Sequence, residues 1–139
     1  TEIRKYTDKP IVVRPHPRNY INIDITKYKN VKMVRPNKDR NTYDDTDLAE
    51  RLKSAWAVVS HSSNPAMTAV FSGIPVFVSE ASLSYDVGNK TFKNILKPDM
   101  PDRQNWANTL AYTEWWTDEI EQGIPWTRIK KRLEEKYIK

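Results

Sequence analysis

The sequence has no cysteine, only three glycines and no long apolar run. The missing cysteines exclude disulfide bonds and thiolate metal sites, and they fit a reducing, cytoplasmic compartment. No apolar segment approaches the roughly 18 residues that a membrane-spanning helix needs, and residues 1–10 lack the apolar core of a signal peptide. We therefore expect a soluble chain without a membrane span.

The composition is that of a globular domain. The 139 residues suffice for one modest core, and 38% hydrophobic with 29% charged residues favours a folded over a disordered chain. The net charge of +5 allows three interpretations: a polyanionic partner, a site for a nucleotide phosphate, or a solvated basic surface. The charge alone does not choose between them.

Short apolar runs occur along the first hundred residues, and from residue 47 onward they alternate with helix signals. We predict strands at 11–13, 31–34, 56–60 and 75–78. One helix is predicted from about 47 to 55, with Asp44, Asp45 or Thr46 as its cap. A second helix starts with Asn64 and Pro65 and stops at Gly73. Continuously apolar strands separated by helices predict an α/β fold, with a Rossmann-like parallel sheet and helices on both faces over residues 1–100.

Residues 101–139 predict a helical tail. Helices are expected at 102–113, from Thr117 to Gly123, and from Pro125 onward. The tail holds four of the five tryptophans, and aromatic residues at this density usually pack a helix against a sheet or a neighbouring domain. We therefore expect the tail to pack on the same domain.

The segment 58–65 runs from a strand through small hydroxyl residues to a helix start. Ligands of open parallel sheets bind at the carboxyl ends of the strands, and a helix start there offers amide groups and partial positive charge. On this interpretation Ser62, Ser63 and Asn64 hold a phosphate. The alternative is that these residues only cap the helix, and the local sequence does not decide.

Arg14 and His16 lie in Arg-Pro-His-Pro, directly after the first predicted strand. The two prolines end the strand and restrict the backbone, so the imidazole of His16 is held in one direction. His16 could donate a hydrogen bond to a phosphate, while Arg14 or Arg18 neutralises its charge. The alternative is a rigid turn with an incidental histidine.

Residues 79–90 follow the fourth predicted strand and belong to the same edge. Ser82, Ser84, Tyr85 and Asp86 are candidates to contact ribose or sugar hydroxyls, although Asp86 suits a helix cap or a turn slightly better. We expect no metal site, because the literal Asp-x-Asp match at 45–47 falls on a predicted helix start.

These elements together resemble the C-terminal, donor-nucleotide-binding half of GT-B glycosyltransferases. The resemblance is carried by Arg-Pro-His-Pro at 14–17, the pair Ser62-Ser63 at a helix start, and Ala-Val-Phe-Ser-Gly-Ile-Pro-Val at 69–76. It covers roughly residues 11–90 and is nearest to the capsule-polysaccharide group, which includes bacterial polysialyltransferases, Kdo transferases and polyol-phosphate transferases.

The resemblance implies that His16 acts as the catalytic residue at the donor phosphate, which Ser62 and Ser63 hold at the helix N-terminus. It further implies a CMP-, CDP- or UDP-linked sugar, no cofactor, and a part in surface or capsular polysaccharide biosynthesis. Many relatives carry Glu-Ala where this chain has Thr68-Ala69, so Thr68 would contact a donor hydroxyl more weakly. Since GT-B catalysis occurs between two domains, an N-terminal acceptor domain or a partner chain is expected to complete the site.

Two other functions compete with glycosyl transfer. A non-catalytic module for nucleotides or phosphosugars would use the same residues without turnover. Nucleic-acid binding is suggested by the basic pI of about 9.4, but the sequence has no zinc motif, no clear helix-turn-helix and no aromatic RNA-binding signature. We therefore expect no nucleic-acid partner.

Overall fold

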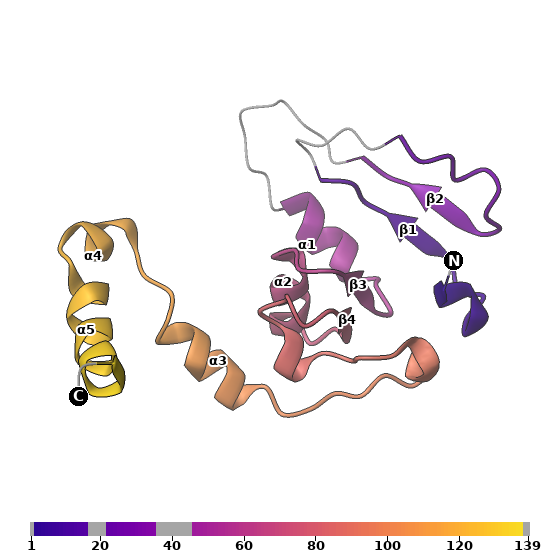
Figure 1. Cartoon of the computed structure of the whole chain (residues 1–139). Coiled ribbons are helices and arrows are strands. Elements are labelled where there is room, and N and C mark those ends of the chain that lie inside the picture. Colours follow the sequence, from indigo (N-terminus) through magenta and orange to yellow (C-terminus); the bar gives the residue numbers. More distant parts are fainter. Residues whose placement is uncertain (1, 17–21, 36–45, 138–139) are drawn as a thin grey trace. The chain divides into compact units, whose positions relative to one another are not determined.

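The computed structural model describes residues 2–16, 22–35 and 46–137 (Figure 1). The chain divides into two compact units, Thr1–Asp102 and Arg103–Lys139, which we call the strand unit and the helical unit. The cap candidates Asp44 and Asp45, together with Pro17 and Arg18 of the histidine segment, lie outside the described residues.

The described strands form two separate parallel pairs. β1 (Ile11–Val13) pairs with β2 (Val31–Met33), and β3 (Val58–Ser60) pairs with β4 (Val76–Val78). The mixed α/β class and the parallel pairing are confirmed, and each strand falls within its predicted range. The single extended Rossmann sheet is not present among the described residues, because no ladder joins the two pairs.

One edge of the second pair is closed to a further strand. The amide of Asn89 donates to the carbonyl of Val76 at 2.7 Å, and the Asn89 carbonyl accepts from the amide of Val78 at 3.3 Å. These bonds occupy the side of β4 that faces away from β3. A longer sheet could therefore grow only at the other edge, along β3.

Helix α2 (Pro65–Phe71) links β3 to β4 and contacts both strands. It starts with Pro65 as predicted, but the side chain of Asn64 makes no capping hydrogen bond, because the Asn64 backbone is already helical (φ −53°, ψ −32°). Gly73 follows the helix with φ +78°, a conformation that glycine adopts at little cost. The predicted β-α-β order is confirmed here, preceded by α1 (Thr46–Leu52), which contacts α2.

The core of the strand unit gathers around β4, whose three residues are all buried. Gly88 lies against this strand: a Cβ there would be 2.6 Å from Cγ2 of Val78 and 2.9 Å from the carbonyl of Ser84, so no side chain fits. Residues 89–92 line a pocket with Val59 and Phe77 of the strand pair.

The side chain of Asn89 ties residues 89–99 together. Its Nδ2 donates to the carbonyls of Val76 (3.2 Å) and Asp99 (3.1 Å). Its Oδ1 accepts from the amide of Asp99 (2.9 Å) and from Nδ2 of Asn94 (2.7 Å). Asn89 is buried and its amide group is fully used, so it fixes the chain that follows β4.

The helical unit contains α3 (Gln104–Ala111), α4 (Thr117–Glu121) and α5 (Ile124–Tyr137), in agreement with the three predicted helices. Gly123 ends α4 with φ +73°. Trp106 is buried, whereas Trp116 and Trp126 are exposed. The packing of this unit on the strand unit stays a prediction. Among the described helices, none has the length and apolar character needed to cross a membrane.

Candidate functional site

The loops that follow β3 and β4 meet at the carboxyl edge of this strand pair. The hydroxyl of Ser79 donates to the carbonyl of His61 at 2.9 Å, and the amide of Ser79 donates to the same oxygen at 3.2 Å. The strands are parallel, so both loops leave the sheet at one edge. The structure thus joins the loop that carries Ser62 and Ser63 to the start of the loop at 79–86.

Ser62 and Ser63 are both exposed at this edge. Some amides of the helix start are already used: Ser63 donates to Oγ of Ser60 at 3.1 Å, and Ala66 donates to the carbonyl of Ser63 at 3.0 Å. In the part of the chain that the structure describes, the amides of Ser62 and Asn64 take part in no hydrogen bond. An anion would therefore meet two amides and two hydroxyls as hydrogen-bond donors. A helix start with all its first-turn amides unpaired would offer more amide donors.

His61 is a candidate that the sequence reasoning passed over. It is exposed, and its Nδ1 lies 3.3 Å from Oγ of Ser62. The tautomer decides which of the two groups donates. In its protonated form the imidazole would add positive charge beside the serine hydroxyls. Its position directly after a predicted strand and before Ser62 could have identified it as a candidate from the sequence.

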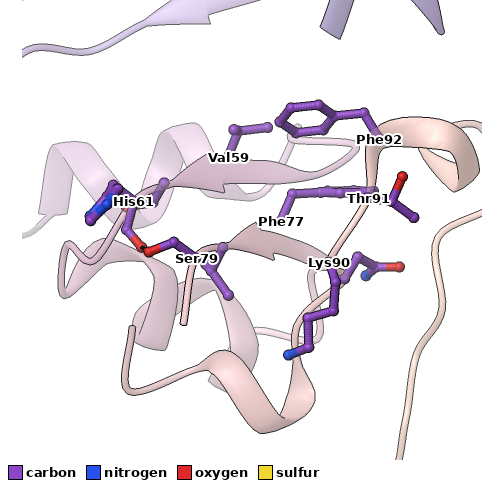
Figure 2. A pocket seen from close by; sticks show the side chains of 10 residues that line it. Val59, His61, Phe77, Ser79, Lys90, Thr91 and Phe92 are labelled. Atoms are coloured by element: carbon purple, nitrogen blue, oxygen red, sulfur yellow. Dashed lines mark hydrogen bonds between the residues drawn. The ribbon is translucent and has the colours of Figure 1, made fainter. Parts of the chain in front are cut away.

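A cavity of about 350 Å³ adjoins this edge (Figure 2). Val59, Phe77 and Phe92 form its apolar side, with the rings of Phe77 and Phe92 at 5.7 Å between centroids. Val59 is 48% exposed, whereas Phe77 is only 2% exposed beneath its neighbours. His61 and Ser79 line the polar side, so the cavity continues the edge described above.

The segment 89–92 supplies the remaining wall of this cavity and was not predicted. The backbone of Asn89 joins β4 through an isolated bridge at Phe77, and Thr91 caps the turn Phe92–Asn94 through a bond from the amide of Lys93. No apolar alternation marks these residues as a strand. Their position depends on the Asn89 network, which joins residues up to thirteen positions apart and leaves no local sequence pattern.

Tyr85 and Asp86 lie in the helical turn Tyr85–Val87, in the segment that follows β4. The ammonium of Lys90 sits 3.3 Å from the centroid of the Tyr85 ring. Partial burial lowers the pKa of Lys90, and the negative charge of Asp86 opposes this shift. One face of the tyrosine ring is thus already in contact with a cation.

Three further candidates differ in exposure. Ser82 is buried, and its hydroxyl accepts from the amide of Ser84 at 3.2 Å, which gives it a role in the turn itself. Ser84 is fully buried, whereas Thr68 is exposed on α2. Contacts of these three residues with a donor stay predictions.

Arg14 and His16 follow β1; Arg14 is partly buried and His16 is exposed. The ammonium of Lys9 lies 4.2 Å from the centroid of the Trp56 ring, which joins the segment before β1 to the segment before β3. Trp56 is held in turn by a bond from its Nε1 to the carbonyl of Ile95 at 2.7 Å. The convergence of His16 with Ser62 and Ser63 stays a prediction.

Within the described ranges, no three His, Asp or Glu side chains gather in a way that could hold a metal ion.

A scan against protein-family models finds no match, and searches of curated proteins and of solved structures find none either.

Proposed function

We propose that the strand unit binds the nucleotide part of an activated sugar and serves as the donor half of a GT-B-like glycosyltransferase. The observation that carries the proposal is the double hydrogen bond from Ser79 to the carbonyl of His61, which joins two polar loops at one sheet edge. Such an edge is where open parallel sheets bind nucleotides. The proposal includes a cytoplasmic role in surface or capsular polysaccharide synthesis.

The donor phosphate would lie against Ser62 and Ser63. Their hydroxyls and the amides of Ser62 and Asn64 supply short donors, and His61 adds an imidazole at 3.3 Å from Ser62. When the bond between the sugar and the phosphate oxygen breaks, negative charge grows on the phosphate. Donors held in place before the reaction stabilise that charge in the transition state.

The nucleoside would enter the adjoining cavity. The exposed side of Val59 and the ring of Phe92 offer apolar walls to a flat base, and Thr91 offers a hydroxyl beside them (Figure 2). Contact between a base and aromatic or apolar side chains tolerates different bases, so several nucleotides would fit.

His16 would reach this edge if β1 lay beside β3 in a continuous parallel sheet. Lys9 and Trp56 each stand two residues before a strand, and their contact brings the amino ends of β1 and β3 near each other. The open edge of β3 is the place where another strand can add. Strands that run the same way would then deliver Arg14 and His16 to the edge that carries Ser62.

Calorimetric titration of the full chain with CMP, CDP, UDP and GDP tests the proposal. We expect binding of at least one nucleotide, and a loss of about tenfold or more in affinity for Ser63→Ala and for His16→Ala, because each removes a hydrogen bond to a charged phosphate. Ser54→Ala, an exposed serine away from the edge, serves as the matched control. Unchanged affinity in both site variants would remove the assignment.

A non-catalytic binding module predicts the same titration. The two functions separate when an acceptor saccharide and an acceptor domain are supplied with the sugar nucleotide. Transfer of the sugar supports the enzyme, whereas binding without transfer supports the module.

A further inference from the structure

Among the described helices, α5 is the longest, and the helical unit itself leaves an apolar stripe of this helix uncovered. α5 spans fourteen residues and none of them is buried. Its stripe consists of one side chain per helical turn: Trp126, Ile129, Leu133 and Tyr137. Trp126 is 60% exposed and Tyr137 is 68% exposed, although both are large aromatic residues. Such a stripe on a helix indicates a surface that meets an apolar partner.

The opposite side of α5 is attached to its own unit. The guanidinium carbon of Arg128 lies 4.8 Å from the ring centroid of Trp115 and 6.0 Å from that of Tyr112. At about 100° per residue, Arg128 stands on the side of the helix away from the stripe. Within the helical unit, α5 is therefore contacted on the side away from the stripe, and the stripe is left uncovered by that unit.

The charges around the stripe identify the kind of partner. α5 carries five basic side chains against two acidic ones, a net charge of +3. Lys130 and Lys136 border the stripe on its two sides, and Lys130 also pairs with Glu134 at 3.7 Å in an exposed ion pair. A strip of tryptophan, tyrosine and aliphatic residues between lysines is typical of helices that lie in the interface of an anionic membrane.

We propose that α5 docks on an anionic lipid surface, with its apolar stripe in the headgroup region and Lys130 and Lys136 against the lipid phosphates. The helix lies along the surface and does not cross it. This inference is independent of nucleotide binding, because it rests on the helical unit alone. Stable attachment needs both apolar burial and charge, because a short apolar stripe or a small positive charge alone attaches a helix to a membrane only weakly.

Co-sedimentation of the full chain with lipid vesicles tests this proposal. We expect binding to vesicles of phosphatidylglycerol mixed with phosphatidylcholine, weakening as salt is raised, and little binding to phosphatidylcholine alone. Lys130→Glu with Lys136→Glu should lower the partition constant by about tenfold for each residue. The matched control is Lys29→Glu with Lys97→Glu, which changes the net charge equally at exposed lysines of the strand unit and should bind nearly as the parent does.

A second variant tests the apolar stripe. Trp126→Ser with Leu133→Ser should abolish binding even at low salt, while circular dichroism confirms that helix content is kept. Unchanged lipid binding in this variant would overturn the proposal, as would failure of the parent chain to bind the anionic vesicles. Self-association of the lipid-free chain that the same variant abolishes would also overturn it, because a second copy would then cover the stripe.

Discussion

The two helices α2 and α5 show how differently the two units use apolar residues. α2 has seven residues and buries Ala66, Ala69 and Val70 against β3 and β4. α5 has twice that length, carries larger apolar side chains and buries none of them. Helical spacing therefore predicts that a helix forms, but burial depends on what stands opposite it. The strand unit buries the apolar face of α2 against its own strands, whereas the apolar stripe of α5 stays exposed within the helical unit.

The strongest test of this difference in burial removes one large side chain from each unit and compares the losses of unfolding free energy. Phe77→Ala should lower the free energy of unfolding by about 3–5 kcal/mol, because Phe77 is buried and the neighbouring Phe92 ring would lose its contact. Trp126→Ala should change it by less than about 0.5 kcal/mol. Urea unfolding of both variants measures the difference, and equal losses would contradict the account of α5.

Asn89 tests whether hydrogen bonds, and not only apolar contacts, hold the segment after β4. Asn89→Ala should cost about 3 kcal/mol, because both the amide and the carbonyl of Asp99 lose the Asn89 side chain as their partner, while the Val76 carbonyl keeps the backbone amide of residue 89. Asn105→Ala, at an exposed position of α3, is the control and should leave the chain as stable or slightly more so. Thermal unfolding followed by circular dichroism compares the two.

Substitutions at two glycines distinguish a steric clash from an unfavourable backbone conformation. Gly88→Ala should destabilise by about 1–3 kcal/mol, because its Cβ would overlap Val78 and the carbonyl of Ser84. Gly73→Ala meets no atom within 4 Å and should cost only about 1 kcal/mol, from the positive φ of that position. A larger loss at Gly73 than at Gly88 in denaturant unfolding would show that residues 84–88 do not pack on β4 as described.

The smallest expected effect concerns a turn before β2. Hydrogen bonds from the hydroxyl (2.6 Å) and amide (3.0 Å) of Thr26 lower the pKa of Asp24. This contact stabilises the fold above the ordinary pKa of an aspartate and is lost as pH falls through the lower pKa of the folded chain. Carbon-detected NMR titration should show the Asp24 pKa rising in Thr26→Ala and staying low in Thr26→Ser. An unchanged pKa in Thr26→Ala would exclude the hydroxyl as the main cause.

Much of the strand unit could be predicted because its signals are local. The four strands are short apolar runs, and α2 is bounded by Pro65 and Gly73, whose backbone preferences act on their own residues. The closed edge of β4 could not be predicted, since it depends on Asn89 returning to the strand from thirteen residues away. The single Rossmann-like sheet was predicted from strand order, but strand order does not determine which edges meet.

The site shows the same division. Sequence placed Ser62 and Ser63 after a strand, and the structure joins their loop to Ser79 as a parallel pair requires. The cavity wall at 89–92 was missed for lack of any periodic pattern, and the burial of Ser82 was missed because a serine in a polar loop gives no sign of it. Exposure and long-range hydrogen bonds depend on the folded chain and cannot be predicted from residues that are adjacent in the sequence.

Chemical-shift mapping of the labelled chain with the best-binding nucleotide tests the central claim most directly. The account predicts that the amide signals of Ser62, Ser63 and Ser79 move together with the ring signals of His16 and His61, while those of α5 stay in place. Movement confined to other residues, or none at saturating nucleotide, would contradict a donor site at the carboxyl edge of β3 and β4.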